Sequence, residues 1–99
     1  MTIHTLKLDP QWFDRVANGT KRVEIRRADR DYQIGDQLVM REIESTMLCD
    51  RYTEREVTVD VTHVLYIVPG LSEGYVALSI SNPRVQEPGE SATTEGDSQ

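Results

Sequence analysis

The sequence predicts a small mixed α/β domain, mostly β, in which about five short strands close into a barrel with one or two short helices. Three observations predict this fold. Several short segments alternate apolar and polar residues, which is typical of strands. One segment near the N-terminus has helical spacing between clear start and stop signals. The length of 99 residues permits a single core, and closing a few strands into a barrel removes most unpaired edges around that core.

The first two elements are a strand and a short helix. Residues 2–8 alternate, with His4 on the same face as two leucines. Asp9 can accept hydrogen bonds from amides of the first helical turn, and Pro10 suits the first helical position. Asn18-Gly19 ends the helix, because glycine readily adopts the left-handed conformation that follows a helix. The residues that helical spacing places on the buried side are Trp12, Phe13, Val16 and Ala17.

The alternation predicts four further strands, over residues 21–27, 37–43, 55–68 and 75–80. Residues 44–52 are interpreted as a loop. In the longest strand, His63 is in phase with the apolar side chains, so we expect a core histidine with one hydrogen bond. Asn82-Pro83 is predicted to end the ordered chain.

The charge of the chain is unevenly distributed. Seventeen acidic and eleven basic residues give a net charge of −6, which taken alone argues against a nucleic-acid-binding protein. Residues 86–99 carry −4 of that charge, whereas residues 15–30 carry a local +4. We therefore expect a nearly neutral domain over residues 1–82 with one basic segment. Residues 83–99 are expected to form a disordered acidic tail, because they contain almost nothing apolar.

Several classes of protein are excluded or disfavoured by composition. The single cysteine, Cys49, rules out an intrachain disulfide and a cysteine-rich zinc site. The two histidines have no metal-ligand spacing, so we expect no metal, and without a glycine-rich phosphate loop we expect no cofactor. There is no apolar stretch long enough to span a membrane and no signal-peptide pattern, so we expect a cytoplasmic protein without a membrane partner.

The strongest local motif is the segment 19–26, GTKRVEIR, which is followed by Asp29-Arg30. It resembles the signature G-x-K-x-x-E-x-R of the ASCH domains in the PUA-like superfamily. Three further family motifs are met by residues 4–7 (HTLK), 35–36 (GD) and 71–78 (LSEGYVAL). The resemblance covers about residues 1–82 and is strongest to small ASCH-like proteins of bacteria and their phages. It implies a PUA-like barrel.

The resemblance also implies an RNA-binding module, or one that binds a nucleotide or modified base, with a groove between helix and barrel. Glu24 and Arg26 share one strand face, and the planar fork of an arginine suits a phosphate or a base edge. Glu24 would accept from a base edge or hold Arg26 in place. The alternative from the residues alone is a solvated strand face with weak ion pairs. The candidate nucleic-acid-binding residues are Lys21, Arg22, Arg26, Arg27, Arg30, Lys7, His4 and Tyr75.

Two other functions stay open. Some ASCH-like proteins are hydrolases of acylated cytidine, with a lysine-activated threonine and a glutamate, and others are described as ribonucleases. Here Lys21 and Glu24 would be the catalytic residues, yet Glu24 occupies the threonine position, and Glu73 would have to match the glutamate. The third alternative is a phage-type protein that binds and modulates a host protein. The oligomeric state is open.

Overall fold

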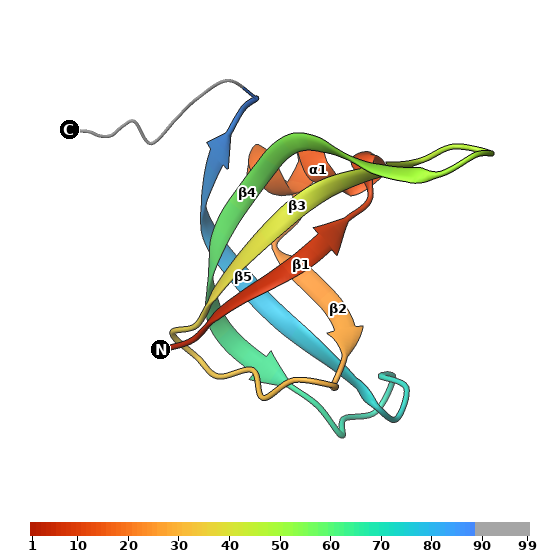
Figure 1. The fold of residues 1–99 in the computed structure, drawn as a ribbon. Helices are drawn as coiled ribbons and strands as arrows, with labels where there is room; N and C mark the ends of the chain where they lie inside the picture. The colour runs from red at the N-terminus through yellow and green to blue at the C-terminus, as the bar shows by residue number, and fades with distance from the viewer. Residues whose placement is uncertain (89–99) are drawn as a thin grey trace.

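The computed structural model describes residues 1–88 and contains one sheet and one helix (Figure 1). The elements, in chain order, are β1 (Ile3–Leu8), α1 (Pro10–Ala17), β2 (Val23–Arg27), β3 (Gln37–Ser45), β4 (Asp50–Leu65) and β5 (Tyr75–Gln86). The strand order is β1-β3-β4-β5-β2, with β1 and β3 parallel and every other pair antiparallel. The predicted class, a small mixed α/β domain that is mostly β, is confirmed.

The sheet is strongly curled but is not closed. β1 and β2 form its two edges, and both lie on the same side of the molecule (Figure 1). Across this seam Arg26 Nη2 donates a hydrogen bond of 2.8 Å to the carbonyl oxygen of Lys7. A side chain therefore bridges β1 and β2 where a barrel would have a backbone ladder. The predicted closed barrel is not confirmed.

Helix α1 packs against β3, β4 and β5 and covers one end of the core. Asp9 Oδ1 accepts from the amide of Gln11 at 3.1 Å, which confirms the predicted N-cap. Phe13 and Val16 are fully buried, but Trp12 is 41% exposed. The prediction that Trp12 is buried is therefore wrong, because an eight-residue helix buries only a narrow stripe. The other fully buried hydrophobic side chains are Leu38, Met40, Val57, Val59, Val61 and Leu78.

The longest strand changes phase along its length. Val57, Val59 and Val61 face the core as predicted, but the pairing register between β4 and β5 shifts between Val61 and His63. A bulge inserts an extra residue and thereby reverses which alternate side chains face inward. His63 is consequently exposed, and the prediction of a core histidine is wrong.

Two segments are more ordered than the sequence indicates. Residues 44–52, expected to be a loop, form the end of a β3–β4 hairpin that projects from the body (Figure 1). β5 runs through Asn82-Pro83 to Gln86, with Val85 paired to Val57. Asn82 has a positive φ of 56°, so the backbone turns there without leaving the sheet. Residues 83–86, expected in the tail, thus belong to the sheet, and the rest of the predicted tail lies largely outside the described residues.

The structure contains no helix, within residues 1–88, with the length and apolar character needed to cross a membrane.

Candidate functional site

The candidate site begins with β2, in which the side chains of Glu24 and Arg26 share the inner face. β2 pairs with β5 so that Glu24 lies opposite Leu78, and cross-strand partners share a face of the sheet. Leu78 is fully buried, and Glu24 is only 4% exposed. Val23 and Ile25 take the opposite phase and are 44% and 58% exposed. The solvated-face alternative is therefore wrong for Glu24.

Glu24 is the centre of a three-residue ion cluster. Its Oε1 accepts from Lys21 Nζ, and its Oε2 accepts from Arg26 Nε at 2.8 Å. The side chains of Lys21 and Arg26 are 23% and 22% exposed. The buried carboxylate thus holds two cations in defined positions at the surface, while Arg26 also reaches the Lys7 carbonyl. This confirms the expected contact between Glu24 and Arg26 and adds Lys21 to it.

Two hollows lie on either side of Arg26, along the open seam between β1 and β2; together we call them the seam groove. The helix-side hollow has a volume of about 440 Å³ and the tyrosine-side hollow about 450 Å³. Lys7, Ile25 and Arg26 line both. The helix-side hollow is otherwise lined by Leu8, Asp9, Trp12, Lys21, Val23 and Glu24. The tyrosine-side hollow is otherwise lined by Thr5, Leu6, Arg27, Asp29, Arg30, Tyr32, Tyr52 and Tyr75.

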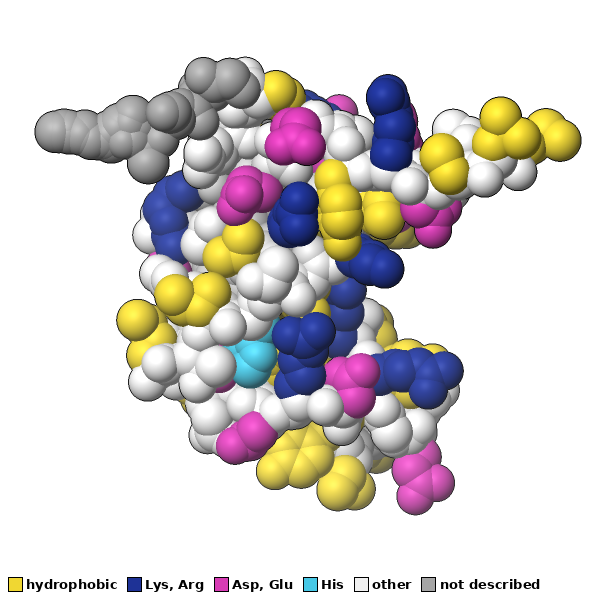
Figure 2. Space-filling view, viewed as in Figure 1, with side chains coloured by type: hydrophobic (Ala, Val, Ile, Leu, Met, Phe, Trp, Pro, Cys, Tyr) yellow, Lys and Arg dark blue, Asp and Glu magenta, His cyan; other side chains and the backbone are white. Residues whose placement is uncertain are grey.

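The tyrosine-side hollow combines cations with aromatic rings. Lys7, Arg27 and Arg30 line it, and none of the three forms an ion pair with another residue in the described part of the chain. Asp29 is its one acidic lining residue. Figure 2 shows Lys and Arg side chains gathered in the concave side of the molecule, below the projecting hairpin. The fold therefore concentrates net positive charge in the hollow.

The three tyrosines of this hollow come from distant parts of the sequence. Tyr32 follows β2, Tyr52 is in β4, and Tyr75 begins β5. Tyr75 is 36% exposed, whereas Tyr32 is 7% exposed, and this burial raises the pKa of its phenol despite the opposing charge of Arg30. In the sequence these tyrosines are not interleaved with basic residues, but in the structure they are.

His4 supports the hollow from inside rather than lining it. It is 6% exposed, its Nε2 lies 2.8 Å from Asp36 Oδ2, and its ring centroid lies 4.7 Å from that of Tyr32. Asp36 also accepts from the amides of Thr2 and Gln33, each at 2.9 Å. Burial raises the pKa of the Asp36 carboxyl, but these hydrogen bonds, that of His4 foremost, hold it below its usual range. His4 is therefore buried behind the hollow, and its role as a binding residue stays a prediction.

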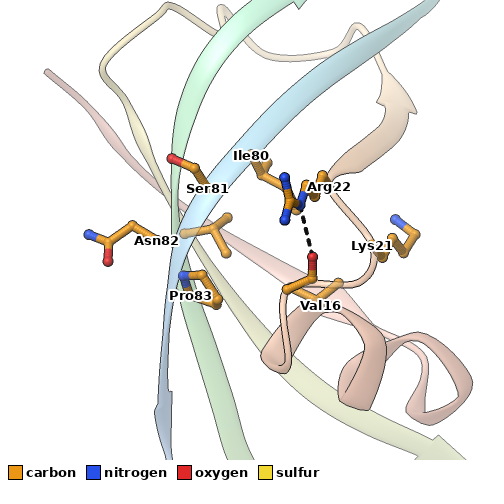
Figure 3. Close-up of a pocket in the computed structure, with 9 residues that line it drawn as sticks. Val16, Lys21, Arg22, Ile80, Ser81, Asn82 and Pro83 are labelled. Carbon is orange, nitrogen blue, oxygen red and sulfur yellow. Dashed lines mark hydrogen bonds between the residues drawn. The ribbon is translucent and has the colours of Figure 1, made fainter.

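Arg22 and Glu73 lie away from the seam groove. Arg22 Nε donates to the carbonyl of Gly19 at 3.0 Å and lines a separate cavity of about 270 Å³ with Val16 and Ile80 (Figure 3). Lys21 also lines this cavity, whereas the other predicted cations do not. Glu73 lines another, mostly apolar hollow with Tyr66 and Tyr75, and no residue of the ion cluster lines that hollow.

Trp12 is a site residue that the sequence analysis missed. It is on the flank of α1 that borders the helix-side hollow, and Lys21 Nζ lies 6.0 Å from its ring centroid. Helical spacing alone places Trp12 with Phe13, since a residue at the border of an apolar stripe looks like a core residue. The signal available was its large amphipathic ring, which is suited to half-exposed positions.

The arrangement is suited to binding rather than to holding a metal. Among residues 1–88 there is no group of three or more His, Cys, Asp or Glu side chains placed to ligate one. Cations aimed at a concave surface and half-exposed rings favour an anionic ligand with planar groups.

Comparison with known proteins places the chain in a family. Residues 3–80 match the model of the family described as "Domain of unknown function (DUF3850)". The chain belongs to the DUF3850 family. A curated relative, "Uncharacterized 12.9 kDa protein in GpA 3'region" of Escherichia phage P2, is 42% identical over 60 residues, or 61% of this chain. The matched segment covers 54% of that relative, about half of its length.

The DUF3850 match includes every residue of the seam groove, from Thr5 to Tyr75. The relative's phage origin agrees with the expected kinship to phage proteins. Neither description states an activity, and neither names the ASCH domains. The ASCH resemblance therefore stays a prediction for this DUF3850 chain.

Proposed function

We propose that this protein binds single-stranded nucleic acid, RNA foremost, in the seam groove. The observation that carries the proposal is the tyrosine-side hollow, where Lys7, Arg27 and Arg30 line the same surface as three tyrosines and form no ion pair within residues 1–88. Proteins that bind single strands combine a basic groove along the backbone with aromatic rings on which bases stack. The choice of RNA follows from the ASCH resemblance.

The cations have distinct roles in this proposal. Arg27 and Arg30 are exposed and contact phosphates, while Arg26 is positioned by Glu24 and presents its guanidinium at the centre of the groove. Lys21 provides a further positive charge beside Trp12 in the helix-side hollow. Because Glu24 neutralises Arg26, the three unpaired cations and Asp29 give the tyrosine-side hollow a net charge of about +2. This charge fits two or three phosphates.

The rings favour a single strand over a duplex. Tyr52 and Tyr75 line a concave hollow of about 450 Å³, a volume suited to one or two nucleobases. Bases in a duplex are stacked on one another and do not offer their faces to side chains. A splayed single strand does, and each base–ring contact contributes about 1–3 kcal/mol.

The hydrolase alternative has weaker support. A general base has to reach the substrate, but the Glu24 carboxylate is buried and bonded to both Lys21 and Arg26. Glu73 lines a different hollow. We therefore assign Glu24 the role of positioning the two cations.

The proposal is tested by fluorescence anisotropy with a labelled single-stranded RNA of about 12 nucleotides. The groove variant is Arg27→Ala/Arg30→Ala. The matched control is Arg15→Ala/Arg22→Ala, which removes the same charge from exposed positions outside the seam groove. We expect the groove variant to bind at least tenfold more weakly, and the control to bind within about twofold of the parent.

Two results would overturn the proposal. One is equal weakening by both variants, since this would mean that net charge alone attracts the RNA. The other is no measurable binding by the parent at low salt. Incubation of the parent with acylated cytidine and with the same RNA decides the hydrolase alternative, because turnover that is lost in Glu24→Gln would favour it.

A further inference from the structure

The β3–β4 hairpin ends in a two-stranded arm, residues 43–52, that has no other strand beside it. The pairing of β1 with β3 ends at Glu42, and the pairing of β4 with β5 begins at Glu56. Between these points the two strands pair only with each other, from Ile43 opposite Tyr52 to Ser45 opposite Asp50. Figure 1 shows the arm projecting well beyond the body of the sheet.

The tip of the arm presents two large apolar side chains to solvent. Met47 and Leu48 are 103% and 95% exposed, the highest values among the exposed large hydrophobic residues of the described chain. Figure 2 shows hydrophobic side chains at the end of the projecting arm. Two adjacent apolar residues at the most accessible point of a molecule are typical of a contact surface.

The turn that carries these side chains is well ordered by hydrogen bonds. Thr46 Oγ1 accepts from the amides of Leu48 and Cys49, at 3.2 and 3.1 Å. The amide of Thr46 donates to the Cys49 carbonyl at 2.8 Å. Because the turn is closed in this way, Met47 and Leu48 are held outward before any partner binds. Such preorganisation reduces the entropy lost on binding.

The arm begins at the seam groove. Tyr52 belongs both to the cross-strand pair at the base of the arm and to the lining of the tyrosine-side hollow. The guanidinium of Arg41 lies 3.8 Å from the Tyr52 ring centroid and holds the ring in place. Leu48 is four residues from Tyr52, so the chain between them spans at most about 13 Å. A strand of nucleic acid that leaves the hollow past Tyr52 therefore comes within reach of the tip.

The arm adds little charge of its own. Arg51 is paired with Glu44 at 2.7 Å, and Asp50 is next to the turn. Any contribution of the tip to binding is therefore apolar. Met and Leu side chains are among those that proteins insert between base steps, which partly unstacks the bases.

We propose that the arm is an apolar wedge that recognises the boundary between a duplex and a single strand. The single strand lies in the seam groove, and Met47 and Leu48 pack on the last base pair, where unstacking is least costly. This inference rests on the proposed function, and it narrows the ligand class to a nucleic acid with such a junction. It explains why an exposed apolar pair stands at the end of an arm that borders a basic groove.

The test compares two probes, a single-stranded RNA and the same strand attached to a short duplex stem. The variant is Met47→Ser/Leu48→Ser, whose positions are exposed and have no packing to lose. We expect the parent to prefer the junction by about tenfold and the variant to bind both probes equally. Binding of the single strand and the salt dependence should stay unchanged. The conservative variant Met47→Leu/Leu48→Met should keep the preference.

Two results separate this inference from the proposed function. If the parent binds the single strand but shows no preference for the junction, or the serine variant keeps that preference, the wedge is refuted and the groove stands. If the parent binds neither probe, the proposed function fails and the wedge fails with it.

A fluorophore on the single cysteine, Cys49, gives a second readout at the tip itself. Its emission should change with the junction probe and not with the single strand, and the reverse would contradict the wedge.

Discussion

The buried ion cluster around Glu24 makes a sharp prediction about stability. In Glu24→Gln the shape of the side chain is kept, but the one negative charge between Lys21 and Arg26 is lost. Removing one partner of a fully buried pair costs about 3–5 kcal/mol, because a charge stays behind without compensation. Here the two cations keep 23% and 22% of their exposure and are partly solvated. We therefore expect a loss of about 2–3 kcal/mol in the free energy of unfolding.

Urea denaturation measures this loss directly. With an m-value of roughly 1.5 kcal/mol per molar, the midpoint should fall by roughly 1.3–2 M with m unchanged. Glu44→Gln is the matched control, since Glu44 is also a strand glutamate paired with an arginine, but its pair with Arg51 is exposed. That control should lose less than about 1 kcal/mol. If the two variants lose the same amount, the reasoning about burial is refuted.

Three further predictions concern side chains around the sheet. The pKa of Glu42 is held below its ordinary value of 4.5, chiefly by the hydrogen bond from Arg55, so stability is lost as the pH falls through the lower pKa of the folded state. The Tm of the parent should therefore decrease at pH values below about 4.5. An equal decrease in Glu42→Gln would contradict this assignment. His63→Ala should change the unfolding free energy by less than about 0.5 kcal/mol, whereas His4→Ala should lower it by about 1–3 kcal/mol because Asp36 loses a buried partner. If thermal melts show equal losses of stability for the two variants, the bulge that exposes His63 is contradicted. Arg26→Lys keeps the charge, but a lysine cannot reach both Glu24 and the Lys7 carbonyl. This variant should therefore bind RNA more weakly and lose about 1 kcal/mol of unfolding free energy in chemical denaturation. If RNA binding and stability are both fully retained, the bridge across the seam is dispensable.

The sequence predicts this fold well where local physics decides the structure. The helix start at Asp9-Pro10 and its end at Gly19 are explicit in the residue types, and both are observed. The alternation in the strands gives the correct number of strands. What alternation does not show is a bulge, because the extra residue leaves no mark in the composition. His63 is therefore misplaced by the same phase argument that places Val57 and Val59 correctly.

The sequence predicts only part of the candidate site, because local patterns do not show which distant residues pair. The motif from Gly19 to Arg26 identified the cluster of Lys21, Glu24 and Arg26, because these residues are close in sequence. The tyrosine-side hollow depends on long-range pairing that brings Tyr32, Tyr52 and Tyr75 together. Residues 44–52 are predicted to form a loop because their apolar and polar residues do not alternate, yet the structure pairs them in the arm.

The salt dependence of RNA binding tests the central claim most directly. Each phosphate contact releases counterions, so the logarithm of the association constant falls with the logarithm of salt concentration with a slope of about −0.7 per contact for a single strand. With about three effective contacts in the seam groove, we predict a slope of about −2 for the parent. Arg27→Ala/Arg30→Ala should reduce it by about 1.4, whereas Arg15→Ala/Arg22→Ala should leave it unchanged. A parent slope near zero, or a slope that the groove substitutions do not alter, would contradict nucleic-acid binding in this groove.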